Sequence, residues 1–480
     1  MTADDWTRAR RAVPEPYPLQ TNLPTDIAMN DPDAKLIPDI SERQARLQQL
    51  TEDALKEARA AGASAAEAAA SNDAGLSVVV RLGEVETIEH TRDNGLGVTV
   101  YFGHRKGSAS TSDLSSEAMR HTVRAACNIA RYTQEDPCAG PADPEFLANE
   151  LPDLDLYHPW DLPVQQAIEH ATACEQAARD LDPRITNSEG ATLNSQAGVY
   201  VYGNTHGFIG GAPGTRHSMS CAVIGQLGDA MQRDYWWSTA RSPQGLERPD
   251  AVGRKTAERT LSRLGARKIT TRQAPVLFQA EVAVGLLRHL VSAIQGSALY
   301  RQASFLLDQL GEQIFPAFVR IHENPRLPGE LGSAAFDSEG VATQTRDLVS
   351  GGILRGYALD SYSACRLGLV TTGNAGGVRN LRIDGGALDR AALLREMDTG
   401  LLVTELMGQG VNQVTGDYSR GAAGVWVERG EVQFPVEEIT IAGTLKDMFR
   451  NLVAVGCDAD YPGSTRTGSW LIEQMTIAGD

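Results

Sequence analysis

The stretch from Thr415 to Trp426 limits what this chain can fold into, because it contains three glycines and almost no long aliphatic side chains. Such a segment fills a core poorly. Glycine accepts positive φ angles and lets another backbone come close, which suits a tight loop or an edge near a second chain. Asp417 and Arg420 add opposite charges. We interpret the stretch either as a ligand-facing edge or, on spacing alone, as an ordinary surface turn.

Two short extended runs follow this stretch. Val425–Glu428 and Glu431–Phe434 are separated only by Arg429 and Gly430. Extended runs joined by two residues, the second of them glycine, predict a β-hairpin with a tight turn. The glycine-rich stretch therefore leads into a sheet.

The charge and hydropathy of the whole chain exclude several classes of protein. The 480 residues include 44 Lys and Arg against 61 Asp and Glu, which gives a net charge of −17. Direct nucleic-acid binding needs clustered cations, so we expect no direct contact with DNA or RNA. No apolar run approaches the ~20 residues that span a bilayer, and the N-terminus has no apolar secretory segment. We therefore expect a cytoplasmic protein without membrane contact.

The six cysteines are scattered and form no C-x-x-C pair. In a chain of this length such cysteines indicate reduced thiols rather than a disulfide framework. Each is expected to be a small buried side chain, and this includes the one nearest the C-terminus. They are Cys127, Cys138, Cys174, Cys221, Cys365 and Cys457.

Composition divides the chain into an arm and two domains. Residues 1–41 are polar and rich in proline, which predicts an extended arm. Residues 42–265, with a proline- and aspartate-rich connector near 132–160, predict an α+β domain in which helices cover one face of an antiparallel sheet. Residues 266–480 are mainly short apolar runs broken by glycine, which is typical of a β-rich domain. The predicted fold class is therefore α+β with two domains.

Local signals place some of the elements. Ser41 and Gln44 fit a capping box at the start of a helix that ends near Gly62. Asp93-Asn94-Gly95 predicts a turn between two strands. Glu281–Ile294 has the periodicity of an amphipathic helix.

Familiar catalytic patterns are incomplete. Asp398-Thr399-Gly400 resembles half of an aspartic-protease site, but that chemistry needs two carboxylates and the sequence has no second copy. His322-Glu323 begins like a zinc-binding helix, but Pro325 forbids a regular helix, so we predict a loop. Nucleophile-elbow and phosphate-loop patterns are absent. The residues by themselves favour binding or assembly over catalysis.

Several segments, in order along the chain, resemble the TldD/PmbA family and, within it, the PmbA (TldE) branch. The resemblance covers roughly residues 42–480. The matching segments are Lys106–Asp113, Tyr300-Arg301 with Ser304-Phe305, Phe336–Gly340, Thr372–Gly377, Gly416–Gly424 with Trp426 and Glu428, and Glu473–Gly479.

The resemblance implies a subunit that pairs with a TldD-type chain. In that pair the TldD-type chain carries zinc on an H-E-x-x-x-H helix with a distant cysteine, and it cleaves extended or unfolded peptides. The family is also linked by name to modulation of DNA gyrase. Where the metal helix would fall, this chain has Leu286–Ala293, in which His289 is the only histidine. One histidine cannot supply the ligands of a catalytic zinc site, so we expect no cofactor in this chain and zinc in the partner.

Two hypotheses from different classes follow. As a non-catalytic subunit, the chain would complete a channel that holds extended peptides by strand addition. Its candidate channel or interface residues are Asp417, Tyr418, Ser419 and Arg420. As an enzyme in its own right, a peptidase or amidase, it would use His289, Cys457 and Glu281 as atypical metal ligands. A third reading, a homodimeric peptide-binding scaffold without a TldD-type partner, differs from the first only in assembly.

Overall fold

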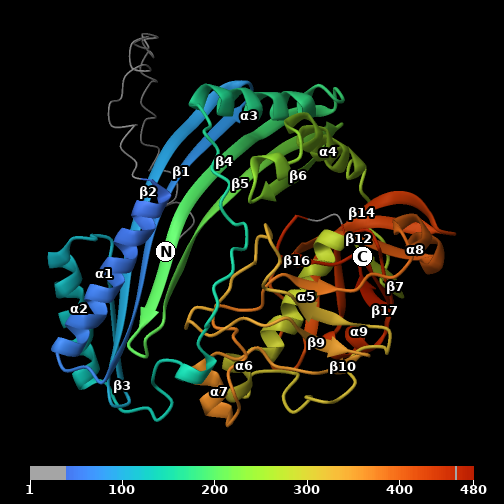
Figure 1. Cartoon of the computed structure of the whole chain (residues 1–480). Helices are drawn as coiled ribbons and strands as arrows, with labels where there is room; N and C mark the ends of the chain where they lie inside the picture. The colour runs from blue at the N-terminus through green and yellow to red at the C-terminus, as the bar shows by residue number, and fades with distance from the viewer. Residues whose placement is uncertain (1–38, 460–461, 480) are drawn as a thin grey trace, which may run out of the picture.

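The computed structural model describes residues 39–459 and 462–479, which form an N-terminal body and a C-terminal body (Figure 1). A long curved sheet dominates the N-terminal body and arches over the C-terminal body. The predicted arm at 1–41 lies almost wholly outside the described residues. The prediction of an α+β fold, with an N-terminal antiparallel sheet and a β-rich C-terminal region, is confirmed.

The N-terminal sheet has six antiparallel strands in the order β3-β2-β1-β4-β5-β6. Its two central strands, β1 and β4, pair over more than a dozen residues, which makes the sheet long and continuous. The strands are β1 (Ala65–Arg81), β2 (Glu84–Phe102), β3 (Arg105–Thr111), β4 (Ile185–Asn204), β5 (Ile209–Leu227) and β6 (Ala230–Ala240).

Four helices cover one face of this sheet (Figure 1). They are α1 (Ile40–Ala60), α2 (Ser116–Tyr132), α3 (Val164–Arg179) and α4 (Pro249–Ser262). Alternation along the strands explains the arrangement, because successive side chains point to opposite faces. Ala68 and Val201 pack in the core with α1 and α2, whereas Glu67, Tyr200 and Tyr202 point to the other face. That second face is polar and aromatic, and it faces the C-terminal body.

The larger sheet of the C-terminal body closes into a ring. Its order is β14-β13-β12-β7-β17-β15, and β14 also pairs with β17. The helix α5 (Ala280–Ile294) packs on one side and α8 (Arg390–Met397) on the other. The strands are β7 (Arg272–Phe278), β12 (Gly400–Met407), β13 (Asp417–Glu428), β14 (Glu431–Thr444), β15 (Leu452–Val455) and β17 (Trp470–Ala478).

A second C-terminal sheet is built from very short strands, in the order β10-β9-β8-β11-β16. They are β8 (Ile321–Glu323), β9 (Arg346–Ser350), β10 (Ile353–Leu354), β11 (Leu381–Ile383) and β16 (Thr465–Arg466). Three short helices, α6 (Gly296–Tyr300), α7 (Ser361–Leu367) and α9 (Leu445–Arg450), complete this body. Long loops connect these pieces and carry many of the polar residues described below.

Two sequence predictions of local structure are confirmed. The hairpin of β13 and β14 turns at Arg429 and Gly430, which have φ angles of 56° and 76°. Both angles lie in the left-handed region that a tight two-residue hairpin turn requires. The amphipathic helix predicted over Glu281–Ile294 is α5.

Two other local predictions are wrong. Asp93-Asn94-Gly95 makes no turn but lies inside β2, because β1 pairs with β2 through this segment and Asn72 bonds Asn94 across the strands. The capping box also fails. The helix α1 already begins at Ile40, so Ser41 is inside its first turn and cannot cap it.

The cysteine prediction is wrong for three of the six residues. Cys138 and Cys365 form a disulfide that joins the connector after α2 to α7 of the C-terminal body. Cys457 is an exposed thiol rather than a buried one, and it lies in the segment that follows the end of β15. Cys127, Cys174 and Cys221 are free and buried, as expected. In the parts of the chain described, no helix is both long and apolar enough to cross a membrane.

Candidate functional site: the groove between the two bodies

The four predicted interface residues open strand β13 and alternate in exposure. Asp417 and Ser419 are exposed, whereas Tyr418 is only 1 % exposed. Asp417 accepts a hydrogen bond from the hydroxyl of Thr415 at 2.6 Å, which fixes the loop before the strand. None of the four lines either of the two large cavities described below.

Tyr418 and Arg420 point toward α5, where they meet His289. The rings of Tyr418 and His289 pack edge to face with centroids 6.1 Å apart. Burial, and then the nearby Arg420 charge, lower the pKa of His289. Burial likewise raises the pKa of Tyr418 against the opposing effect of the nearby Arg420, and no described group lies in hydrogen-bonding geometry to its hydroxyl. The structure thus brings three of the predicted residues together, in a closed and mostly apolar setting.

The residues of the alternative metal hypothesis do not gather at one place. Glu281 accepts hydrogen bonds from Arg259 and Gln279 at the start of α5. Cys457 follows β15 and lies beside Leu388, next to α8 on the other side of the sheet from α5. Among residues 39–459 and 462–479, no three His, Cys, Asp or Glu side chains are placed to hold a metal ion.

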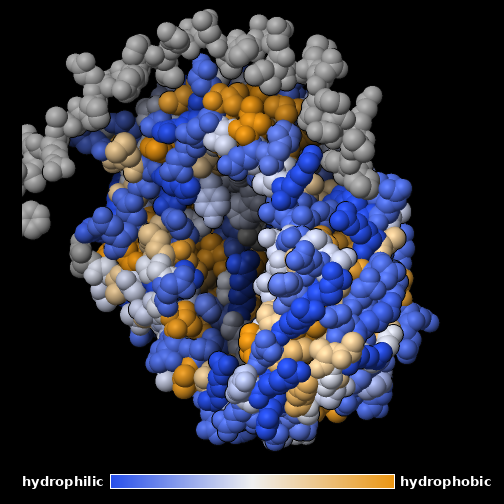
Figure 2. Space-filling view, turned by 90° about the vertical axis from the view of Figure 1, so that its left-hand side faces the viewer, coloured by the Kyte–Doolittle hydropathy of each residue, from blue (hydrophilic) through white to orange (hydrophobic). Residues whose placement is uncertain are grey.

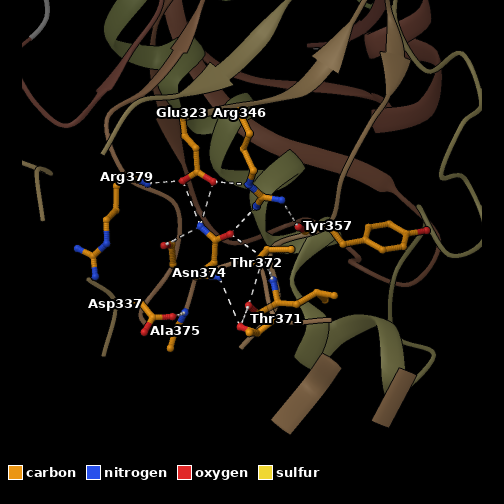
Figure 3. Close-up of polar contacts among 12 residues, drawn as sticks. Glu323, Asp337, Arg346, Tyr357, Thr371, Thr372, Asn374, Ala375 and Arg379 are labelled. Carbon is orange, nitrogen blue, oxygen red and sulfur yellow. Dashed lines mark hydrogen bonds and ion pairs between the residues drawn. The ribbon is translucent and has the colours of Figure 1, made fainter. Parts of the chain in front are cut away.

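A buried polar cluster occupies the short-stranded sheet and centres on Glu323, which is 2 % exposed (Figure 3). Its carboxylate accepts hydrogen bonds from Arg346 Nε at 2.8 Å, from Asn374 Nδ2 at 3.1 Å and from the backbone N–H of Arg379 at 3.0 Å. Arg346 also donates to the side-chain oxygen of Asn374 and to the Tyr357 carbonyl. The predicted loop at His322-Glu323 is therefore wrong, because this strand carries a fully partnered carboxylate.

Asp337 anchors the loop beside this cluster. Its carboxylate accepts backbone N–H groups of Glu339, Val341 and Ala375 at 2.9 to 3.0 Å. Burial raises the pKa of this carboxyl, while the three N–H groups and the Arg379 charge act in the opposite direction. The loop therefore holds Ser338 and Glu339 in fixed positions at the edge of the C-terminal body.

Two cavities lie between the polar face of the N-terminal sheet and the loops of the C-terminal body. The first has a volume of about 1080 Å³ and the second about 760 Å³. Both are lined by Tyr200 and Ser338, so we treat them together and call them the groove. The molecule's mainly hydrophilic surface is visibly hollowed in Figure 2.

In the first cavity, Glu67 is held between two tyrosines. Its carboxylate accepts hydrogen bonds from the hydroxyls of Tyr101 at 2.6 Å and Tyr202 at 2.7 Å. Burial, and then the Glu67 charge, raise the pKa of both tyrosines. Glu339 lines the same cavity from the opposite body, and burial raises its pKa to about 7. A carboxyl group that titrates near neutral pH can hold or release a proton in this cavity.

A disulfide lies beside the first cavity. Cys138 lines the first cavity, and its partner Cys365 belongs to α7. A hydrogen bond of 2.7 Å from the Tyr362 hydroxyl to Asp136 joins the same two segments. Tyr300 packs edge to face on Tyr362. The two bodies are therefore fastened to each other beside the cavity.

Reasoning from single residues missed the groove, because its lining comes from segments far apart in the sequence. The available signal was the set of family segments. Lys106–Asp113 supplies Lys106 and Ser108 to the first cavity, and Phe336–Gly340 supplies residues to both cavities. Thr372–Gly377 supplies Asn374 to the buried cluster. Two segments quoted for the resemblance thus meet around the groove, and a third belongs to the buried cluster beside it.

Comparison with known proteins agrees with this architecture. The family models for the PmbA/TldA metallopeptidase match residues 66–130 as domain 1, 157–264 as the central domain and 271–479 as the C-terminal domain. The chain belongs to the TldD/PmbA family, in its PmbA branch.

Particular relatives are similar over nearly their whole length. The metalloprotease PmbA of Escherichia coli O157:H7 is 54 % identical over 414 residues, which is 86 % of this chain and 92 % of that protein. A crystal structure from Bacteroides thetaiotaomicron, described as a putative modulator of DNA gyrase, has a TM-score of 0.85 at 28 % identity and covers 90 % of this chain and 99 % of that one. TldE of Thermococcus kodakarensis, at 19 % identity and a TM-score of 0.75 over 90 % of this chain and 100 % of that one, shares the fold.

The metal implied by the family description does not fit the residues of α5. A catalytic zinc ion takes three protein ligands and leaves one position open. On α5, Leu286, Leu290 and Ala293 are fully buried in the core, and the one histidine packs against Tyr418 beside the cationic Arg420. A positive charge next to the only available nitrogen opposes a bound cation. We derive no metal-dependent step for this chain.

Proposed function

We propose that this chain is a non-catalytic subunit of a TldD/TldE-type metalloprotease complex, and that its groove helps to form the channel in which extended or unfolded peptides bind. The observation that carries the proposal is the groove itself. Ionisable and aromatic side chains line the groove, where a ligand can reach them. On α5, by contrast, His289 is largely buried and packs against Tyr418. In this proposal zinc and the catalytic residues belong to the TldD-type partner.

The edge strand β3 supports binding of extended peptides. Within the described residues β3 pairs only with β2, so its other edge carries backbone groups without a strand partner. Its side chains Lys106, Ser108 and Ser110 line the first cavity. A peptide that lies there can add a strand to the sheet by main-chain hydrogen bonds, which accept many sequences. Tolerance of sequence suits a channel for unfolded substrates.

The test compares the purified chain alone with the chain purified together with a TldD-type protein of the same organism. We expect the lone chain to contain no stoichiometric zinc and to cleave no unfolded peptide, and the mixture to do both. Light scattering then distinguishes a heterodimer from a homodimer. Stoichiometric zinc and peptide cleavage by the lone chain, lost in Cys457→Ala or His289→Ala, would establish the enzyme hypothesis instead.

A second arm tests the groove. Tyr200→Ala removes a ring that lines both cavities and should weaken the binding of a labelled unfolded peptide, measured by fluorescence anisotropy. Phe318→Ala removes an aromatic ring that is 53 % exposed and lines neither cavity, and it serves as the control. Equal binding by the two variants would contradict the assignment of the groove to the channel.

A further inference from the structure

Three arginines line the second cavity, and the side chain of one of them forms no hydrogen bond or ion pair within the described residues. The cavity of about 760 Å³ is bounded by strands β1, β4 and β5, by residues 151–157 of the connector and by residues 333–338 of the C-terminal body. Its arginines are Arg216, Arg241 and Arg379. Four aspartates, Asp73, Asp153, Asp155 and Asp337, line the same cavity.

The backbone of Arg379 belongs to the Glu323 cluster, whereas its side chain extends away from it. Its N–H donates to Glu323 at 3.0 Å, which ties the residue to the buried cluster. Figure 3 shows its side chain leaving that cluster, with no bond drawn from the guanidinium. The Nε atom is buried and has no hydrogen-bond partner in the described parts of the chain. Burial lowers the pKa of Arg379, and the nearby charges of Asp337 and Glu323, which act in the opposite direction, do not offset it.

Three of the four acidic residues around the cavity already have partners, and the fourth is Asp73. Asp337 accepts three backbone N–H groups, as described above. Asp153 accepts the N–H of Asp155, and Asp155 in turn pairs with His158 at 3.2 Å. The nearest cation to Asp73 in electrostatic terms is Arg43 on α1 rather than Arg379. None of the four forms an ion pair with Arg379 within the described residues.

Arg241 also has a buried guanidinium N–H group without a hydrogen-bond partner among the described groups. Arg241 donates to the carbonyls of Thr215 at 3.1 Å and Leu331 at 2.8 Å, which clamps it between the two bodies. Its Nε atom is nevertheless buried without a partner among the described groups. Burial, and then the neighbouring Arg216 charge, lower its pKa. Two unpartnered N–H groups of cationic side chains therefore border one cavity.

We propose that the second cavity binds a carboxylate of the peptide substrate, with Arg379 as its principal ligand. Guanidinium groups bind carboxylates through paired N–H donors, and an anion here would satisfy groups that the fold leaves unpartnered. This inference rests on the proposed function, because it specifies which chemical group of the peptide the channel recognises. The carboxylate is supplied either by the C-terminus of the peptide or by an Asp or Glu side chain.

The experiment titrates the full chain with three labelled peptides that differ only in carboxylates. The first is an acetylated poly-alanine peptide with a free C-terminus, the second is the same peptide with a C-terminal amide, and the third is the amide with one internal glutamate. A charge-assisted paired contact predicts that a carboxylate peptide binds at least about tenfold more tightly than the neutral amide. The first or the third peptide shows which source is preferred.

Variants assign the contact. In Arg379→Gln the preference for a carboxylate peptide over the neutral amide should fall to about twofold or less. In Arg379→Lys, which keeps the charge but loses the paired N–H donors of the guanidinium, the preference should be intermediate. The control Arg320→Gln removes an exposed arginine outside the cavity, paired with Asp347 and Asp384, and should keep the full preference. The unliganded Arg379→Gln protein should melt no lower than the parent, because it loses an unpaired half-buried charge.

The other outcomes would contradict the carboxylate site, the role of Arg379 or the proposed function itself. If all three peptides bind equally well to the parent chain, the carboxylate site is wrong while peptide binding stands. If Arg379→Gln keeps the preference, Arg379 is not the ligand. If none of the peptides binds to the chain, alone or with its TldD-type partner, both this inference and the proposed function fail.

Discussion

The Glu323 cluster and the groove lie side by side, but they differ in whether their buried polar groups have hydrogen-bond partners. In the cluster each charged group has a partner, and Glu323 alone accepts from Arg346, Asn374 and the backbone of Arg379. In the groove, Arg379 and Arg241 keep unpartnered N–H groups, and Glu339 is a carboxyl with a strongly raised pKa. The two regions meet at Arg379, whose backbone belongs to one and whose side chain belongs to the other.

The difference separates groups that hold the fold from groups that await a ligand. A buried polar group with its partners costs little, whereas an unpartnered one lowers stability by about 1–3 kcal/mol. A chain that keeps several unpartnered groups around one groove is less stable than it need be. Substitutions in the cluster should therefore lower stability, and substitutions in the groove should change ligand binding or pH response instead.

The largest effect is expected for Glu323→Ala. The substitution leaves the Arg346 guanidinium, whose side chain is 19 % exposed, without its carboxylate. Removing one member of a buried ion pair typically costs about 3–5 kcal/mol in free energy of unfolding, to be measured by urea denaturation. The control Glu189→Ala breaks a pair with Arg233 in which both side chains are more than 40 % exposed, and should cost less than about 1 kcal/mol. Equal losses would erase the distinction between the two kinds of site.

Cys138→Ser should follow, because it removes the covalent link between the two bodies. The bridged residues are 227 positions apart, and loss of such a disulfide typically costs about 2–4 kcal/mol. The melting temperature of the parent should fall when a reductant is added, and that of Cys138→Ser should not respond. Cys457→Ser, at the exposed free thiol, should behave like the parent. A parent chain that melts at the same temperature with and without reductant would contradict the expectation.

Glu339→Gln tests the groove through pH. Burial raises the folded-state pKa from the ordinary 4.5 to about 7, so between these values the folded chain binds more protons than the unfolded chain. The stability of the parent should therefore fall as pH rises from about 4.5 to 7. The variant has no such proton, so relative to the parent it should gain at most about 3 kcal/mol by pH 8 and nothing near pH 4.5. Thermal unfolding across this range measures the difference, and a difference independent of pH would refute the assignment.

Tyr418→Phe should have the smallest effect. The hydroxyl of Tyr418 has no partner among the described groups, so its removal should change stability by no more than about 0.5 kcal/mol. Tyr418→Ala, by contrast, empties a ring-sized space beside His289 and should cost about 3–5 kcal/mol. A large loss for the phenylalanine variant in urea denaturation would mean that the hydroxyl contributes a contact after all.

The sequence predicts those parts of the fold that depend on neighbours along the chain. The hairpin at Arg429-Gly430 and the helix over Glu281–Ile294 follow from turn chemistry and periodicity. The turn at Asp93-Asn94-Gly95 fails because pairing along the whole of β1 outweighs a local preference. The prediction that all cysteines are reduced fails for a related reason. Cys138 and Cys365 are 227 positions apart, and nothing in the sequence indicates that the fold brings them together.

The candidate site is less predictable than the fold. The sequence points to Tyr418, Arg420 and His289, and these residues do lie together, but in an enclosed region. The groove needs Glu67 and Tyr200 from the N-terminal sheet and Arg379 from a C-terminal loop, and no spacing in the sequence links them. Whether a polar group has a partner is a property of three-dimensional packing, so the sequence could not distinguish Arg346 from Arg379.

The ring of strands in the C-terminal body sets an order for completing the molecule during synthesis. The last strand, β17, lies between β7 and β15 and closes the ring against β14. Because a ribosome releases the chain from its N-terminus, every strand of the N-terminal sheet has emerged by residue 240, whereas the ring stays open until residue 478 has emerged. Until that moment β7 and β14 expose edges that can pair with another chain. This body therefore depends on its final strand, and a prematurely ended chain should aggregate rather than fold.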